Sequence, residues 1–240
     1  MIRPNANGFG LEVVVNGRAL PVIEHGGKLY IAAPWDSDFK LRFKTPYGGR
    51  FEAVASVDGL DIITGKTASK DASGYVVTGS AEIPGFRLNN SEVAAFHFGD
   101  RTDSYAAQLD KPKNIGVLAV VFYSERPRFR GSMMSMTKGG CLGGGLEGNT
   151  RGGGTFGGGA TRGGGVGHDM GTEFGKRQDH KVTTTQFERQ SQMSTIVIEY
   201  ASREKLIEAG IIREAALGDV NPFPADEEPG CKPPKNWRGK

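Results

Sequence analysis

The sequence predicts an all-β protein, an antiparallel β-sandwich of jelly-roll type with a Gly-rich insertion and a short C-terminal helix. Short apolar stretches rich in Val, Ile, Phe and Tyr recur over residues 10–123, with no helical pattern between them. Turn-forming pairs such as Asn16-Gly17 and Asp58-Gly59 close these stretches. In FKLRFK, residues 39–44, apolar and charged side chains alternate, so one face of this strand meets a core and the other meets water.

The expected strands of the first half follow one another at short intervals. Asn16-Gly17 favours a tight two-residue hairpin, because both positions tolerate the positive φ that such a turn needs. Gly26-Gly27 and Tyr47-Gly48-Gly49 mark further turns. The strands are expected at 11–15, 19–25, 28–34, 39–44, 50–57, 60–64, 74–79 and 81–86.

The stretch NIGVLAVVFYSE, residues 114–125, differs from the others. Its positions 115–123 carry apolar residues on both faces of the strand, interrupted only by Gly116. Such a strand lies in the middle of a sheet and is covered on both sides. In a sandwich one side is the core, and the other must contact a helix, an inserted loop or another subunit.

Regular structure is expected again near the C-terminus. KVTTTQFERQ (181–190) and STIVIEY (194–200) are predicted to be strands. A short helix over 201–210 follows, with Ser202 as its N-cap and Gly210 at its end. The side chains expected to face the sandwich are those of Leu206, Ile207 and Ile211.

Residues 139–167 are of another kind, because sixteen of these 29 residues are glycine and Thr-Arg-Gly-Gly-Gly occurs twice. Few side chains offset the backbone entropy lost on ordering, so a flexible loop is expected. We therefore divide the chain into one sandwich domain (1–125 and 181–217), a Gly/Arg-rich insertion (126–180) and an extended Pro-rich tail (218–240). The side chains proposed to anchor the tail on a neighbouring surface are Phe223 and Trp237.

Composition favours a protein of the cytoplasm or of an assembled particle, without a membrane partner. No run approaches the ~18 apolar residues of a membrane helix, and the N-terminal residues lack the pattern of a signal peptide. Cys141 and Cys231 have no metal-ligand spacing and are expected to be free thiols. The net charge is +3, but residues 124–181 alone carry +4, so the basic charge is confined to one region.

The stretch DGLDIITGKT, residues 58–67, ends like a phosphate-binding loop. That motif needs four residues between its first Gly and Gly-Lys-Thr, whereas five separate Gly59 from Gly65. Leu-Asp-Ile-Ile is strand-like, and no helix is expected after Thr67 to hold an anion. We therefore predict a short strand between two glycine turns, with Lys66 in water.

Catalytic and metal-binding patterns are weak. The four histidines form no His-x-His or His-x-x-x-His pair, and HDMGTEFGKRQDH (168–180) is interpreted as a solvated polar loop rather than a metal site. No Gly-x-Ser-x-Gly turn or activated cysteine is present. The sequence thus predicts a protein that is not an enzyme and has no cofactor and no metal.

The basic insertion is a candidate nucleic-acid interface. In SERPRFRG three arginines alternate, so in an extended chain they project the same way and can follow a phosphate backbone. Arginines followed by three glycines, with a Phe between them, resemble the Arg-Gly-Gly segments of RNA-binding proteins. The alternative is that the insertion is a charged, soluble linker without a binding function. The candidate residues for nucleic-acid or partner binding are Arg126, Arg128, Arg130, Arg151, Phe156 and Arg162.

The order of several motifs resembles a family of uncharacterised β-rich proteins. The matching stretches are SVDGLDIITGKTAS (56–69), GYVV (74–77), IPGFRLN (83–89), VAAFHFGD (93–100), SYAAQ (104–108), KNIGVLAVVF (113–122) and FERQSQMSTIVIEYASREKLIEAGI (187–211). The resemblance implies a shared fold over most of the chain apart from the insertion and the tail. It implies no activity and no catalytic residues.

Two functions are compatible with these features. The first is a non-catalytic structural or interaction protein that assembles with copies of itself, as a homo-oligomer in a particle, a filament or a virion-like component. It depends on the two-sided apolar strand and on the absence of a catalytic pattern. The second is a nucleic-acid-binding protein that uses the arginines of the insertion. An enzyme that acts on carbohydrates or small molecules would need a concave pocket on a sheet with paired carboxylates.

Overall fold

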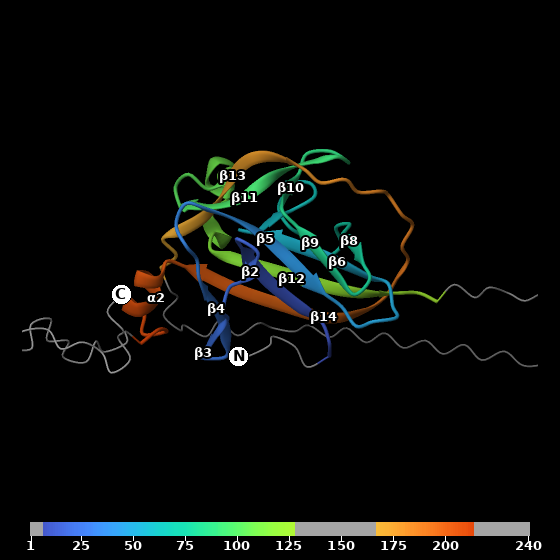
Figure 1. The fold of residues 1–240 in the computed structure, drawn as a ribbon, viewed down its shortest axis with the longest axis horizontal. Helices are drawn as coiled ribbons and strands as arrows, with labels where there is room; N and C mark the ends of the chain where they lie inside the picture. The colour runs from blue at the N-terminus through green and yellow to red at the C-terminus, as the bar shows by residue number, and fades with distance from the viewer. Residues whose placement is uncertain (1–6, 128–166, 214–240) are drawn as a thin grey trace, which may run out of the picture.

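The computed structural model describes residues 7–127 and 167–213, which form two β-sheets packed face to face (Figure 1). The prediction of an all-β sandwich is confirmed. Within these residues, helical structure is limited to short elements: α1 (Tyr105–Gln108), the 3-10 helix η1 (Pro112–Asn114) and α2 (Arg203–Glu208). Among the described residues, no helix is long and apolar enough to cross a bilayer.

Sheet 1 consists of β1 (Gly10–Val15), β2 (Arg18–Ala19), β5 (Ser37–Lys44), β9 (Ser80–Ile83), β10 (Gly85–Arg87), β11 (Glu92–Asp100) and β13 (Met170–Asp179). Its main order is β10-β11-β5-β1-β2, and β13 and β9 pair with β11 and β5 respectively. All these pairs are antiparallel. The expected turn at Asn16-Gly17 is confirmed, because both residues have positive φ, 49° and 77°.

Sheet 2 consists of β3 (Ile23–His25), β4 (Lys28–Ala32), β6 (Phe51–Val57), β7 (Leu60–Asp61), β8 (Tyr75–Val77), β12 (Val117–Glu125) and β14 (Arg189–Ala201). Its order is β3-β4-β14-β12-β6-β7, and β8 also pairs with β6. The pair β14–β4 is parallel, so the expectation of purely antiparallel pairing is wrong here. The two strands are far apart in sequence, and no hairpin fixes their relative direction.

The core lies between the sheets. From sheet 1, Phe39 stacks on Phe98 with ring centroids 4.0 Å apart. From sheet 2, Leu118, Val120 and Phe122 of β12 are fully buried. β12 lies between β14 and β6, as expected for a central strand. Burial of these large apolar side chains is the main stabilising term of the fold.

The stretch that resembles a phosphate-binding loop is a hairpin, as predicted. Leu60 of β7 pairs with Val57 of β6. Gly59 and Gly65 on either side have positive φ, 77° and 67°, and Lys66 is exposed. No helix begins after this turn, so the anion-binding geometry is absent from it.

Two predictions near the C-terminal half are wrong. Residues 168–180 were expected as a polar loop, but 170–179 form β13, with Met170 and Thr172 buried against the core. This strand lies within the range 126–180 assigned to the insertion. Residues 181–188, expected as a strand, belong to neither sheet, because they cross from β13 in sheet 1 to β14 in sheet 2. β11 was also missing from the expected strands.

The C-terminal helix is confirmed. The Ser202 hydroxyl accepts a hydrogen bond from the Lys205 amide, which caps the first turn of α2. Gly210 follows the helix with a φ of 71°. Leu206 is fully buried, whereas Ile207 and Ile211 are half-buried.

Candidate interaction surface

The outer face of sheet 1 is charged. Arg42 on β5 donates hydrogen bonds to Glu82 (2.6 Å) and to Glu12 (3.1 Å). Lys44 pairs with Glu12, and Lys40 lies 3.6 Å from Glu82. These contacts lower the pKa of the Glu82 carboxyl. A face of this kind is stable in water and needs no covering partner.

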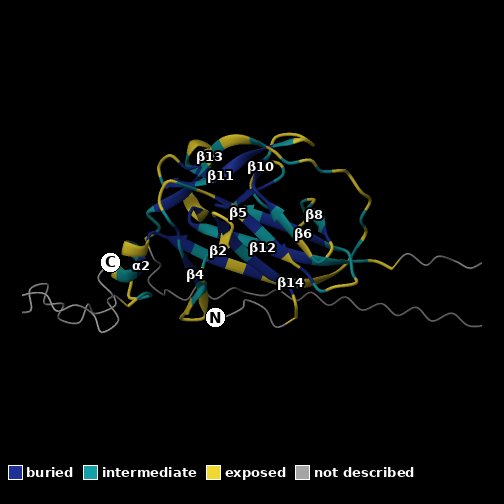
Figure 2. Cartoon of the chain, viewed as in Figure 1, coloured by how far each residue is buried: buried dark blue, intermediate teal, exposed yellow. Residues whose placement is uncertain are grey.

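The outer face of sheet 2 is apolar at its centre. On β12, Val117, Ala119 and Val121 point away from the core, since Leu118, Val120 and Phe122 point into it. Ala119 lies opposite Val197 of β14, and Val121 lies opposite Val54 of β6. We call these outward residues the apolar strip: Val54, Val117, Ala119, Val121 and Val197. Figure 2 shows the alternation of buried and exposed positions along β14.

Cover across the apolar strip is uneven. Val54 and Val121 are each 6% exposed, whereas Val197 is 45% exposed. Met193, further along β14, is 43% exposed. The solvent exposure of the apolar strip therefore increases toward β14, where the side chains of Val197 and Met193 face solvent.

Helix α2 covers one end of this outer face. Leu206 packs with Tyr30 of β4 and Ala201 of β14 in a second, smaller hydrophobic cluster. The half-buried side chains of Ile23, Ala32, Ile211 and Ile212 complete this cluster. The expected contact of the helix with the sandwich is thus made on the outside of sheet 2.

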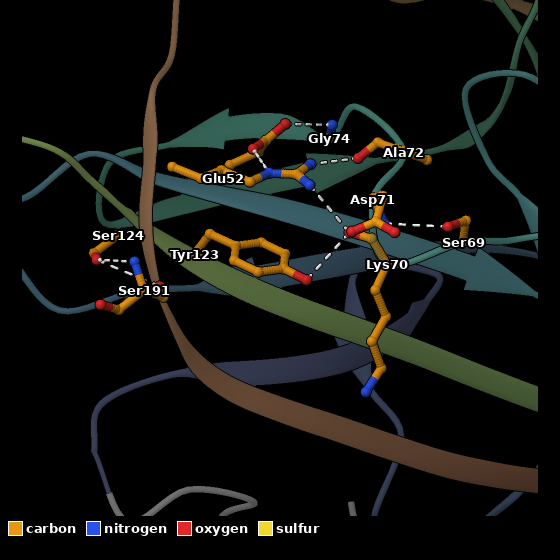
Figure 3. A network of polar contacts seen from close by, with 10 residues as sticks. Glu52, Ser69, Lys70, Asp71, Ala72, Gly74, Tyr123, Ser124 and Ser191 are labelled. Atoms are coloured by element: carbon orange, nitrogen blue, oxygen red, sulfur yellow. Dashed lines mark hydrogen bonds and ion pairs between the residues drawn. The ribbon is translucent and has the colours of Figure 1, made fainter. Parts of the chain in front are cut away.

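The segment after the glycine hairpin, residues 68–74, covers the other end. Arg189 on β14 donates to the carboxylate of Glu52 (2.5 Å) and to the carbonyl of Lys70 (3.1 Å). Figure 3 labels Glu52, Lys70 and Tyr123 of this network. The Arg189 guanidinium lies 4.4 Å from the centre of the Tyr123 ring. The Tyr123 hydroxyl also donates to the Lys70 carbonyl. An inserted loop therefore covers the outer side of β12 here, one of the three expected alternatives.

A hollow of about 480 Å³ lies beside the open end of the strip. Its lining includes Leu29 of β4 and Val197 of β14. At its rim the Lys28 ammonium pairs with the Glu199 carboxylate at 2.7 Å, and Glu199 lies 3.6 Å from His168. The charges that border the strip are thus paired within the chain.

A buried carboxylate holds the end of β6. Asp58 accepts hydrogen bonds from the amides of Gly116 (2.9 Å) and Thr172 (2.7 Å) and from the Tyr200 hydroxyl (2.7 Å). Burial raises the pKa of Asp58 to about 6, and these donors limit the rise. The contacts join the β6–β7 turn to the segment before β12, to β13 and to β14. Both carboxylate oxygens accept hydrogen bonds from the chain, so Asp58 serves as a buried structural acceptor.

A second hollow, of about 760 Å³, lies on sheet 1 beside His97 of β11. The His97 ring contacts the carboxylates of Asp38 (2.8 Å) and Asp36 (3.2 Å), one at each nitrogen. Both ring nitrogens are therefore occupied. In the described part of the chain, no three His, Cys, Asp or Glu side chains are arranged to hold a metal ion.

Most residues expected to bind a partner lie outside the described structure. Arg126 is exposed, and its amide donates to the Glu188 carbonyl at 2.8 Å. Outside the described residues lie Arg128, Arg130, Arg151, Phe156, Arg162, Phe223, Trp237, Cys141 and Cys231. Nucleic-acid binding and tail anchoring therefore stay predictions.

Comparison of the chain with protein-family models, curated proteins and solved structures finds no match in any of the three.

Proposed function

We propose that this protein is a non-catalytic structural or interaction protein that self-associates through the apolar strip. The observation that supports it most is the contrast between the two outer faces. Sheet 1 presents ion pairs to water, whereas the outer face of sheet 2 carries apolar side chains and leaves Val197, 45% exposed, open to solvent. Apolar side chains left open to solvent on one face favour an interaction site there.

The charge pattern favours a second copy of the chain as the partner. Lys28 is paired with Glu199 at one end of the strip, and Arg189 is paired with Glu52 at the other. A charged partner would therefore meet no unpaired opposite charge at these two positions. The apolar strip of a second copy is complementary to this surface, because both are apolar. A two-fold axis places the same patch on both subunits, and two sheets can then pack face to face.

A charged substitution within the strip tests this proposal. Val197→Lys places an ammonium at a half-exposed position that the folded monomer tolerates, but it buries that charge in the interface. We expect the dimer dissociation constant to rise at least ~100-fold, which corresponds to about 3 kcal/mol. Sedimentation velocity measures the change.

Leu88→Lys is the matched control, because Leu88 is an apolar side chain of similar exposure, 40%, on the turn after β10. This variant should associate like the wild type. If Val197→Lys associates as tightly as Leu88→Lys, the strip is not the interface.

A further inference from the structure

Residues 180–188 form a strap across an open side of the sandwich. The strap leaves β13 in sheet 1 and enters β14 in sheet 2, and it follows an extended path outside both sheets (Figure 1). It connects the two sheets and adds a strand to neither.

Both ends of the strap are fixed by hydrogen bonds. At its start, the amides of His180 and Val182 donate to the carbonyls of Ser91 (2.8 Å) and Asn90 (2.9 Å). At its end, Arg50 donates to the Thr185 hydroxyl at 3.0 Å. Between these anchors, Thr183 and Thr184 are exposed and make no hydrogen bond to another described residue.

A hollow of about 720 Å³ lies against the inner side of the strap. This volume is in the usual range of small-molecule sites. Its polar lining combines hydroxyl and amide groups with cations: Ser73, Tyr75, Asn90, Thr183 and Thr184 with Arg87 and Lys181.

Arg87 has no acidic partner in the described part of the chain. Its guanidinium donates to the Tyr75 hydroxyl (3.0 Å), to the carbonyls of Asn89 (3.3 Å) and His180 (2.6 Å), and to the ring nitrogen of His180 (2.5 Å). All these acceptors are neutral groups. Burial, and then the charge of Arg87, lower the pKa of His180, so this ring is uncharged at pH 7.

The other charged groups of the hollow are already compensated. Arg50 pairs with Glu125 at 2.6 Å, and Glu52 pairs with Arg189 at 2.5 Å. Lys181 is exposed at the lining and has no ion-pair partner among the described residues. The hollow therefore carries two positive charges without counter-ions among the described residues, the half-buried Arg87 and the exposed Lys181, and such a pair favours an anion.

We propose that the hollow under the strap binds a small hydroxylated anion, of the class of sugar acids and sugar phosphates. Arg87 and Lys181 attract the carboxylate or phosphate group. The hydroxyls of Thr183, Thr184 and Ser73 and the Asn90 amide bind the hydroxyl groups of the ligand. This site is separate from the apolar strip and does not depend on self-association.

Calorimetric titration with four probes tests the proposal. Glucuronate and glucose 6-phosphate carry the two candidate anionic groups, glucose lacks the charge, and inorganic phosphate lacks the sugar hydroxyls. We expect at least one charged sugar to bind at millimolar concentration or below, at least tenfold more tightly than glucose and phosphate, and more weakly as salt is added. The stronger of the two charged sugars identifies the anionic group.

A charge-reversal variant locates the binding. Lys181→Glu should weaken the binding of the charged sugar at least tenfold, since Lys181 is exposed and its replacement leaves the fold intact. Lys66→Glu is the control, because Lys66 is an exposed lysine that does not line the hollow, and this variant should bind like the wild type. No binding of either charged sugar, binding equal to that of glucose or phosphate, or unchanged binding by Lys181→Glu would each overturn the proposal.

Discussion

Asp58 shows how one residue of a simple turn can hold several strands together. Its φ of 53° places it in the left-handed turn before Gly59, and its side chain enters the core. There it accepts bonds from Gly116, Thr172 and Tyr200, which belong to three different segments. The amides of Gly116 and Thr172 are buried donors whose acceptor is the Asp58 carboxylate, so its loss would leave them without this partner.

The raised pKa of Asp58 predicts a pH dependence of stability. The pKa of Asp58 in the folded protein, about 6, exceeds the ordinary 3.8. The stabilisation that comes from the protonated, buried carboxyl is therefore fully present below about pH 4, and it is lost as the pH rises through 6. The difference in unfolding free energy between wild type and Asp58→Asn should thus shrink by roughly 3 kcal/mol from pH 3.5 to pH 7.5. Urea unfolding of both proteins across this range measures it. A difference that stays constant or grows with pH would contradict the assignment.

At the scale of elements, the contacts of Arg189 fix the segment 68–74 on sheet 2. Arg189→Met removes the donors to Glu52 and to the carbonyls of Lys70 and Ala72. We expect trypsin to cleave after Lys70 at least tenfold faster in this variant, because the segment loses its anchor. Arg18→Met, on the exposed strand β2, is the matched control. Equal cleavage rates in both variants would show that other contacts hold the segment.

The strap should open in acid. Burial and the charge of Arg87 lower the pKa of His180. The stabilising hydrogen bond from Arg87 to the neutral His180 ring is therefore present above the ordinary pKa of 6.5, and it is lost as the pH falls through the lower pKa of the folded protein. Protonation places a second cation against the Arg87 guanidinium. Hydrogen exchange at the Val182 amide, corrected for the intrinsic rate, should be faster at pH 5 than at pH 7.5. The amide of Val120 in the core serves as the internal reference, and equal changes at both amides would refute this opening.

The sequence predicted elements where local pattern determines structure. The alternation in Phe39, Leu41 and Phe43 identified β5, and the two-sided apolar run identified β12 as central. The sequence does not predict β13, because its polar residues resemble a loop. The structure shows that Gly171 and Gly175 allow this strand to approach neighbouring segments closely. Val182 and three threonines favour a strand over 181–190, whereas the path of the strap depends on where β13 and β14 end.

The candidate sites were less accessible from sequence. The sequence allows for a loop that covers β12 as one of three alternatives. It does not predict which loop this is, because the segment 68–74 is held there by Arg189, which contacts Glu52 and Tyr123. No local signal marks Arg87 as a cation without an acidic partner, because its neighbours come from distant segments. The sequence does not indicate that the Asp58 side chain is buried, because Asp-Gly is a common pair in turns.

At the scale of the whole molecule, the two faces of the sandwich differ in chemistry. The ion pairs on sheet 1 suit water, and the apolar strip on sheet 2 suits another apolar surface. A two-fold contact through the strip forms a closed dimer, and growth into a particle or filament requires a second interface elsewhere. Self-association through sheet 2 is therefore the central claim about function.

Sedimentation velocity of the wild-type chain at increasing concentration tests this claim most directly. We expect a concentration-dependent shift from the 25.7 kDa monomer to a species of about twice that mass. The shift should be complete at micromolar concentration and persist at high salt, because apolar contacts are not screened. A single 25.7 kDa species at every concentration would refute self-association through the apolar strip.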